Sequence, residues 1–257
     1  MKRSYILCGL LLLLCIGCAS HPYKDTITQA STIDILLAGV YDGEMTLGEL
    51  SEYGDFGIGT FNRLDGEMII LDQTIYQVKA DGRVYRPANE VKTPFAVVSY
   101  FEADQYIDIK KPVNFEQLQS LIDKHIRDPH IFYGIRISGR FSKMHTRSVP
   151  AQQRPYPPLT EVAKTQPEFV MKDISGTIVG FRCPEYVKGI NVPGYHLHFI
   201  SKDLKQGGHI LGFELSGGRI EIDSANRFTL IMPEHCEDRQ KLDLSRDREK
   251  ELEAVEN

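Results

Sequence analysis

The sequence has no excess of positive charge and only one long hydrophobic run. Its 257 residues include 30 Lys and Arg against 35 Asp and Glu, which gives a formal net charge of −5. Because proteins that neutralise phosphate groups carry a basic excess, we expect no nucleic-acid partner. A hydrophobic fraction of 42% is enough for a sizeable core, which argues against a disordered chain or a coiled coil.

The long hydrophobic run lies at the N-terminus, where residues 5–16 follow Lys2 and Arg3. A basic start, a short apolar run and small residues after it are typical of a secretory signal, and the run is too short for a transmembrane helix. We therefore expect export to the periplasm or the exterior. The sequence around Cys18 also resembles a lipoprotein box, so a lipidated Cys18 could anchor the protein to a membrane. Plain cleavage near Ala19 is the alternative.

Cysteine is scarce outside this N-terminal stretch. Three of the five cysteines lie within residues 1–20, which leaves Cys183 and Cys236. In an oxidising compartment these two could form a disulfide, and two buried free thiols are the alternative.

Three histidines have the spacing of a metal site. His196 and His198 are two residues apart in the apolar run 194–200, so both side chains leave the same face of a strand. After ten intervening residues and a predicted Gly-Gly turn, His209 begins a second apolar run that could fold back beside the first. Three imidazoles suit zinc, copper, iron or nickel, and three protein ligands leave a position open for water or substrate. The pattern predicts a catalytic metal site, and polar residues on a half-exposed strand are the alternative.

The periodicities predict an α/β (α+β) fold with few helices and a two-part, mixed β-sheet or barrel-like architecture. Helices are expected at 31–40, 46–52 and 114–126, and strands at 54–61, 67–71, 94–101 and 131–141. The second half contains mainly short strands: two around Gly176, two joined by a turn at Gly217-Gly218, and one at 228–232. A proline-rich stretch before residue 166 suggests a boundary. We expect a signal peptide at 1–20, a mixed α/β domain at 21–165 and a β-rich, metal-binding domain at 166–257.

Other ionisable residues give weaker signals. Glu67 lies at the mouth of an apolar strand, where desolvation could tune it as an acid or base, although a solvated turn residue is the alternative. The last 21 residues contain 13 charged ones, which on composition indicates a frayed helix or a solvated tail. His125 is expected on the apolar stripe of the helix at 114–126, at the edge of the core. Three further histidines have no partner spacing and are assigned no role: His130, His145 and His235.

The chain resembles the α-acetolactate decarboxylase family over nearly all of the sequence after residue 31. The motifs that carry the resemblance are Gly59-Thr60-Phe61, Leu64-Asp65-Gly66-Glu67, Lys92-Thr93-Pro94-Phe95-Ala96-Val97, Arg147-Ser148-Val149-Pro150, Arg154-Pro155-Tyr156-Pro157-Pro158-Leu159-Thr160-Glu161-Val162, and the histidine block from Val192 to His209. The resemblance implies zinc-dependent decarboxylation of 2-acetolactate to acetoin and CO2 through a metal-stabilised enediolate, and suggests a homodimer.

The same resemblance implies roles for particular residues. The three ligands of Zn2+ would be His196, His198 and His209. Catalytic roles fall on Glu67, Arg147 and a C-terminal glutamate, best matched by Glu256, with Glu251 or Glu253 as alternatives after a small shift. Thr60 would contact the substrate.

Two other functions fit part of the pattern. Cupin-type metal oxygenases also place an HxH pair and a later histidine on strands, but no glutamate follows His198 at short spacing, and Asp203 is only an approximate substitute. An exported metal-binding lipoprotein without catalysis is the third interpretation.

Overall fold

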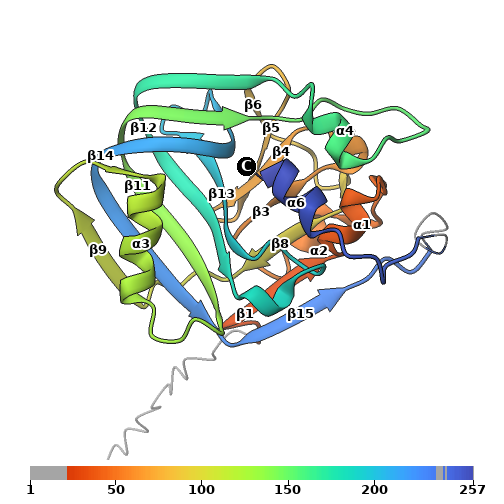
Figure 1. Ribbon diagram of the computed structural model, residues 1–257, viewed down its shortest axis with the longest axis horizontal. Coiled ribbons are helices and arrows are strands. Elements are labelled where there is room, and N and C mark those ends of the chain that lie inside the picture. The colour runs from red at the N-terminus through yellow and green to blue at the C-terminus, as the bar shows by residue number, and fades with distance from the viewer. Residues whose placement is uncertain (1–21, 236–239, 241, 257) are drawn as a thin grey trace, which may run out of the picture.

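Two β-sheets with a few short helices make up the protein, as the sequence predicts. The computed structural model describes residues 22–235, 240 and 242–256, so the predicted signal peptide, Cys18 and Cys236 lie outside the described residues. Figure 1 shows the two sheets side by side, with α6 lying across the region where they meet. Within the described residues, no helix is long and apolar enough to cross a membrane.

The first sheet has seven strands in the order β15-β1-β8-β3-β4-β5-β6. All its pairings are antiparallel except that of β1 with β15. Its strands are β1 (Thr26–Ala30), β3 (Phe56–Thr60), β4 (Glu67–Leu71), β5 (Thr74–Val78), β6 (Val84–Tyr85), β8 (Ala96–Ser99) and β15 (Arg227–Ile231). A separate short pair is formed by β2 (Met45–Thr46) and β7 (Lys92–Thr93).

The second sheet closes on itself into a barrel-like ring. Its long strands pair in the cycle β11-β12-β13-β14, and β14 returns to β11. The strands are β9 (Gln105–Ile109), β10 (Val113–Asn114), β11 (Phe132–Arg147), β12 (Glu168–Cys183), β13 (Gly194–Ser201) and β14 (Gly207–Ala225). Apolar side chains of these strands form one core, which includes Ile137, Phe141 and Phe199.

Two of the helices begin at capping boxes. A capping box at Thr46 and Glu49 starts α2 (Leu47–Leu50), and one at Asn114 and Gln117 starts α3 (Phe115–His125). The remaining helices are α1 (Ile33–Leu37), α4 (Leu159–Ala163), α6 (Glu249–Glu256) and the 3-10 turns η1 (Asn62–Leu64) and η2 (Glu185–Val187). Because Ser31 can cap a helix, the helix expected at 31–40 should begin after it; the observed cap is Thr32, whose side chain accepts from the Ile35 N–H, so that expectation was wrong by one residue.

Two predicted turns are instead positions where strands pack closely. Gly176 lies inside the continuous strand β12, and a Cβ there would come within 2.4 Å of the Ile200 carbonyl oxygen. Gly218 lies inside the continuous strand β14, and a Cβ there would come within 2.4 Å of the Ser138 carbonyl oxygen. The expected strand breaks at Gly176 and at Gly217-Gly218 were therefore wrong, because these glycines admit a neighbouring strand.

The histidine hairpin forms, but its reversal comes earlier than predicted. The turn occupies residues 202–206, and Gly207 and Gly208 already pair with Ile200 and Phe199 of β13. Similarly, β11 runs six residues past the expected end at residue 141, up to Arg147. Both extensions carry active-site candidates to the same end of the barrel.

Each sheet contains strands from both sides of the boundary expected at residue 165. β11 and β12 flank that position and pair from Tyr133 opposite Arg182 to Arg147 opposite Glu168. Conversely, β15 joins the first sheet beside β1. The boundary expected at residue 165 therefore does not coincide with the division between the two sheets. One apolar cluster contains residues of both sheets, together with Leu252 and Val255 of α6.

Candidate metal centre and active site

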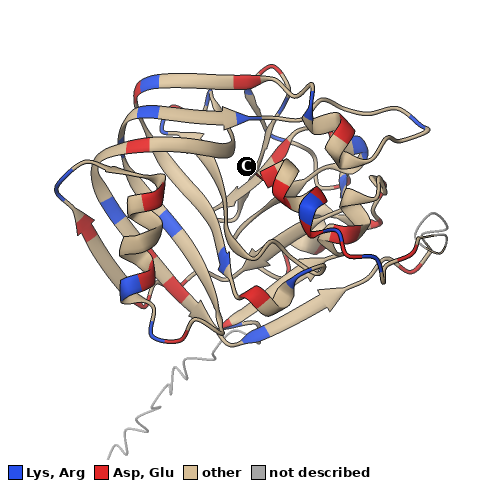
Figure 2. Cartoon of the chain, in the orientation of Figure 1, with Lys and Arg blue, Asp and Glu red and all other residues tan. Residues whose placement is uncertain are grey.

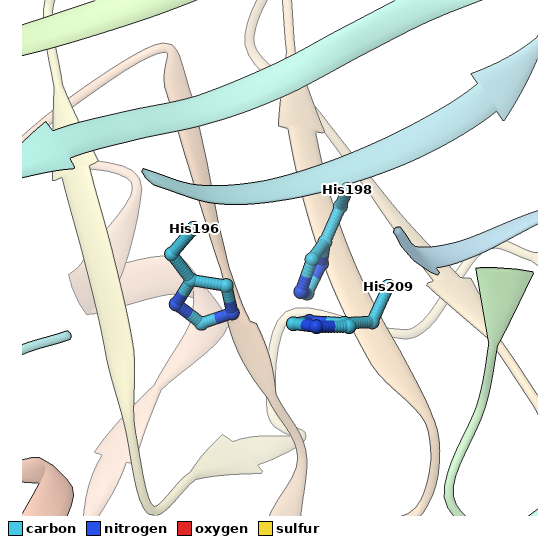
Figure 3. A group of neighbouring side chains, drawn as sticks. All are labelled: His196, His198 and His209. Carbon is cyan, nitrogen blue, oxygen red and sulfur yellow. The ribbon is translucent and has the colours of Figure 1, made fainter. Parts of the chain in front are cut away.

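Three histidines converge at the end of the barrel-like sheet. His196 and His198 project from β13, and His209 of β14 lies directly opposite His198 in the antiparallel register. One ring nitrogen of each lies within 4.8 Å of the others, and all three side chains are buried. Figure 3 shows the three rings turned toward a common point. The predicted grouping of His196, His198 and His209 is confirmed.

Hydrogen bonding leaves donor nitrogens free for a metal ion. Nδ1 of His198 lies 2.8 Å from the carbonyl oxygen of Met68. Because a carbonyl oxygen only accepts, Nδ1 carries the proton and Nε2 keeps its lone pair. Nε2 of His198 is buried without a hydrogen-bond partner among the described residues, and a bound metal ion would satisfy it.

The surroundings keep these imidazoles neutral. Burial, assisted by the charge of Arg147, lowers the pKa of His196 to about 3. Burial likewise holds the pKa values of His198 and His209 well below the usual range. Neutral imidazole is the form that binds metal ions, so the residues present fit a zinc-type ion with three nitrogen ligands.

Glu67 lies beside the histidines, at the start of β4 and opposite Thr60 of β3. Its Oε2 is 3.7 Å from Nε2 of His198, and its Oε1 is 3.8 Å from Nη1 of Arg147. Burial raises the pKa of Glu67 to about 7, although Arg147 and the backbone N–H of Val149 oppose the shift. A carboxyl with a pKa near 7 can both hold and release a proton in neutral solution.

Arg147 is the last residue of β11 and is 4% exposed. It donates from Nη1 to Oε1 of Gln166 and from Nη2 to the Val255 carbonyl oxygen, each at 2.9 Å. Neither carboxylate forms a hydrogen bond with it, since Glu67 and Glu256 lie 3.8 and 3.9 Å away. The guanidinium is therefore held by uncharged oxygens, between two carboxyl groups.

Glu256 reaches the site from α6. Its Oε2 lies 3.9 Å from Nε2 of His196 and 3.8 Å from Nε2 of His209. Burial raises the pKa of Glu256 to about 7, and Arg147 opposes the shift. Of the two alternatives, Glu251 pairs with Arg246 and Arg248, and Glu253 is exposed. The structure therefore brings Glu256 to the histidines.

The charged tail is not simply solvated, because one face of α6 is apolar. Figure 2 shows acidic and basic segments along α6 and the stretch before it. Leu252 and Val255 nevertheless point inward and are buried, and Glu256 follows Leu252 by one helical turn. The expected helix therefore forms over residues 249–256, but the expectation of a solvated tail was wrong there, since the 3.6-residue periodicity places Leu252 and Val255 on one buried face.

Two cavities meet at this site. The inner one, of about 40 Å³, is lined by Thr60, Glu67, Arg147, Glu256 and the three histidines, among others. Thr60 is buried and donates from Oγ1 to the Gly66 carbonyl oxygen at 2.8 Å. The outer one, of about 470 Å³, lies between α3, β13 and α6 and shares only His209 and Glu256 with the inner one. These two side chains separate the cavities.

Other candidate residues lie elsewhere. His125, His130 and His235 are exposed, and His145 pairs with Glu168 on the barrel. Asp203 accepts from Ser201 and does not approach the histidines. Cys183 is a buried free thiol, and burial raises its pKa to about 12, so it is unreactive in neutral solution. The possible partner Cys236 lies outside the described residues.

Sequence reasoning missed three groups that hold the site in place. Gln166 and the Val255 carbonyl oxygen orient Arg147, and the Met68 carbonyl oxygen orients His198. Backbone oxygens have no side-chain signature. Gln166 lies in the segment between α4 and β12, and nothing in its spacing distinguishes it from a solvated loop residue.

Comparisons with known proteins point to one family. A family model described as alpha-acetolactate decarboxylase matches residues 27–246. The alpha-acetolactate decarboxylase of Methanosarcina mazei is 44% identical, covering 92% of this chain and 82% of its own length. That of Methylococcus capsulatus is also 44% identical, covering 92% of both chains.

A solved structure shows the same fold. The crystal structure of alpha-acetolactate decarboxylase from Bacillus subtilis strain 168 matches with a TM-score of 0.88 at 39% identity, covering 90% of this chain and 99% of that one. The sequence, the fold and the family model therefore lead to one conclusion: the chain belongs to the alpha-acetolactate decarboxylase family.

Proposed function

We propose that this chain decarboxylates 2-acetolactate to acetoin and CO2 with the help of a bound zinc ion. The observation that carries the proposal is the burial of three neutral imidazoles beside two carboxyl groups and one guanidinium. Burying unpaired ionisable groups costs several kcal/mol, about the scale of a protein's whole net stability, so such a cluster points to function. Membership of the family supports the substrate.

The histidines would hold the metal ion. His196, His198 and His209 supply three nitrogen ligands, a number that leaves positions for substrate oxygens. A bound zinc ion would supply Lewis-acid stabilisation of negative charge on those oxygens. Met68 contributes by fixing the tautomer of His198 through its carbonyl oxygen.

Arg147 supplies the only cation among the described residues that line the inner cavity. 2-Acetolactate is an anion, and the guanidinium can orient its carboxylate by charge-assisted hydrogen bonds. When CO2 leaves, the bonding electrons remain on the substrate as an enediolate, and the charge of Arg147 stabilises that developing negative charge. Thr60 forms part of the cavity wall beside Glu67.

Glu67 and Glu256 would donate the proton that the product requires. The enediolate carbon must take up one proton to give acetoin, and each carboxyl has a pKa of about 7. They approach different nitrogens of Arg147, so they would lie on different sides of an anion held by that guanidinium. Either carboxyl in its protonated form can donate to the carbon on its own side.

The remaining expectations are part of the same proposal. Residues 1–20 have the composition of an export signal, which supports a periplasmic or extracellular enzyme, and lipidation of Cys18 would anchor it to a membrane. The resemblance to the family supports a homodimer. The family match favours decarboxylation over a cupin-type oxygenase and over metal binding without catalysis.

The proposal is tested with purified protein and 2-acetolactate in the absence of oxygen. We expect acetoin and CO2 in equal amounts, inhibition by a chelator, and recovery after zinc is added. Oxygen consumption with iron present and no acetoin would favour the oxygenase. Tight zinc binding with no turnover of 2-acetolactate or related β-keto acids would favour the non-catalytic lipoprotein.

A further inference from the structure

Arg147 lies near two uncharged oxygens and two carboxyl groups, and it forms hydrogen bonds only with the uncharged oxygens. Its two terminal nitrogens donate at 2.9 Å to uncharged oxygens, those of Gln166 and Val255. The carboxylates of Glu67 and Glu256 stay at 3.8 and 3.9 Å. A buried guanidinium ordinarily forms short, charge-assisted hydrogen bonds with a carboxylate, at about 2.7–2.9 Å. Something therefore prevents Arg147 from closing onto either carboxyl group.

We propose that Gln166 is a positioning residue, which holds Arg147 between the two carboxyl groups and keeps it available for the substrate anion. The inference rests on the proposed function, because it assigns Gln166 a role in that reaction through Arg147. Gln166 accepts from Nη1, the nitrogen that also faces Glu67, so it competes directly with that carboxylate for the donor.

The segment that carries Gln166 is fixed next to Arg147 by backbone pairing. Glu168 lies opposite Arg147 at the end of the β11–β12 register. The backbone N–H of Ser148 donates to the Pro167 carbonyl oxygen at 3.2 Å. The backbone that carries Gln166 is therefore held beside the guanidinium by the strand pair, as a positioning role requires.

The amide also suits the task chemically. An uncharged oxygen can hold a guanidinium nitrogen without neutralising its charge, whereas a third carboxylate would compete with the substrate anion. The Val255 carbonyl oxygen plays the matching part for Nη2 from α6. Two neutral acceptors thus set the position of Arg147 and leave it without a carboxylate at hydrogen-bond distance.

The test removes the acceptor and keeps the side-chain length. In Gln166→Met we expect metal content like that of the wild type and kcat/KM lowered about 10- to 100-fold, the scale expected when a reacting group is misplaced by about 1 Å. A crystal structure of this variant should show Arg147 Nη1 moved from 3.8 Å to hydrogen-bond distance of Glu67. Gln153→Met, at an exposed glutamine before α4, is the matched control and should retain the wild-type rate.

A double-mutant cycle separates positioning from a general structural role. If Gln166 acts through Arg147, Gln166→Met should cause no further loss, within about twofold, in an Arg147→Ala background. An equal loss in both backgrounds, or a wild-type rate in Gln166→Met, would overturn the inference. If the wild-type protein fails to convert 2-acetolactate, the proposed function fails instead, and the Arg147–Glu67 distance in the variant still decides whether Gln166 holds the guanidinium.

Discussion

At the scale of single residues, the site is a buried cluster of ionisable groups held slightly apart. Glu67 and Glu256 approach their histidine and arginine neighbours at 3.7–3.9 Å, beyond hydrogen-bond range. The pKa of each carboxyl is near 7 because burial outweighs the attraction of Arg147. Such an arrangement lowers the stability of the folded protein. It is expected of a site that binds a metal ion and a substrate anion.

The first residue-scale prediction concerns Arg147 and Glu67. We expect Arg147→Ala and Glu67→Gln to fold and bind metal but to turn over 2-acetolactate at least about a hundredfold more slowly, since each loses a group that acts on the reacting atoms. Steady-state kinetics and metal analysis on the same samples provide the check. Arg140→Ala, at an exposed arginine of the same strand, serves as the control. Wild-type rates in either variant would remove that residue from the mechanism.

The second residue-scale prediction concerns pH and a buried carboxyl outside the active site. Asp223 of β14 is 6% exposed, and burial raises its pKa to about 7, with nearby acidic residues adding to the shift. Because the folded state binds this proton more tightly than the unfolded state, Asp223 lowers stability as the pH rises from about 4 to 7.

Asp223→Asn should remove that dependence. The amide oxygen can still accept the Glu102 N–H, which lies 3.2 Å from the carboxylate. At pH 8 we expect the variant to gain on the order of 1–3 kcal/mol over the wild type, and at pH 4 no gain. Denaturant unfolding at both pH values measures the difference. Asp173→Asn, at an exposed aspartate, is the control; an equal gain at both pH values would show that the carboxyl is not responsible.

At the scale of elements, the capping boxes of α2 and α3 and the apolar run of β4 were predictable, because their signals lie within a few residues. The glycines of β12 and β14 were misread for a physical reason. A glycine that permits a turn and one that admits a neighbouring strand look alike locally, and only the partner strand distinguishes them.

One such glycine supports the active site directly. Gly208 of β14 has a φ of +136°, and a Cβ there would come within 2.4 Å of the Arg147 carbonyl oxygen. We expect Gly208→Ala to displace Arg147 and His209, lowering both metal content and stability, the latter by about 1–3 kcal/mol. Gly212→Ala in the same strand meets no atom within 4 Å and should change neither. Metal analysis and thermal unfolding of the two variants test this prediction. Equal metal content and equal stability in Gly208→Ala and Gly212→Ala would contradict it.

Helix α6 provides a matched pair of glutamates. Glu256 lies on the inner face, near His196 and His209, whereas Glu253 is exposed. Glu256→Gln should therefore lower kcat about a hundredfold without loss of metal, and Glu253→Gln should leave kcat unchanged. Steady-state kinetics of the two variants test this. A loss of kcat in Glu253→Gln and an unchanged kcat in Glu256→Gln would contradict the placement of Glu256 at the site.

At the scale of the whole molecule, the site is assembled from four segments distant in sequence. β4 contributes Glu67, β11 contributes Arg147, the β13–β14 hairpin contributes the histidines, and α6 contributes Glu256. The two sheets and α6 share one apolar cluster, so the packing that joins them also brings these side chains together. Figure 1 shows α6 lying over this meeting point.

This assembly explains what the sequence could predict. The histidine site was predictable because a strand's two-residue period and one reversal suffice to bring three rings together. Glu67, Arg147 and Glu256 converge only through long-range packing, so no local pattern links them and the family resemblance was needed to place them. Neither a local sequence pattern nor the family resemblance pointed to Gln166.

The central claim is that the three buried histidines hold the metal ion on which decarboxylation depends. It is tested most directly by stripping the protein with a chelator and titrating zinc back while acetoin formation is measured. We predict that activity disappears with the metal and returns to a plateau at one ion per chain, and that His235→Ala, at an exposed histidine that lines neither cavity, behaves in the same way. His196→Ala should recover neither zinc nor activity. A metal-free protein that still forms acetoin at the full rate would contradict the account.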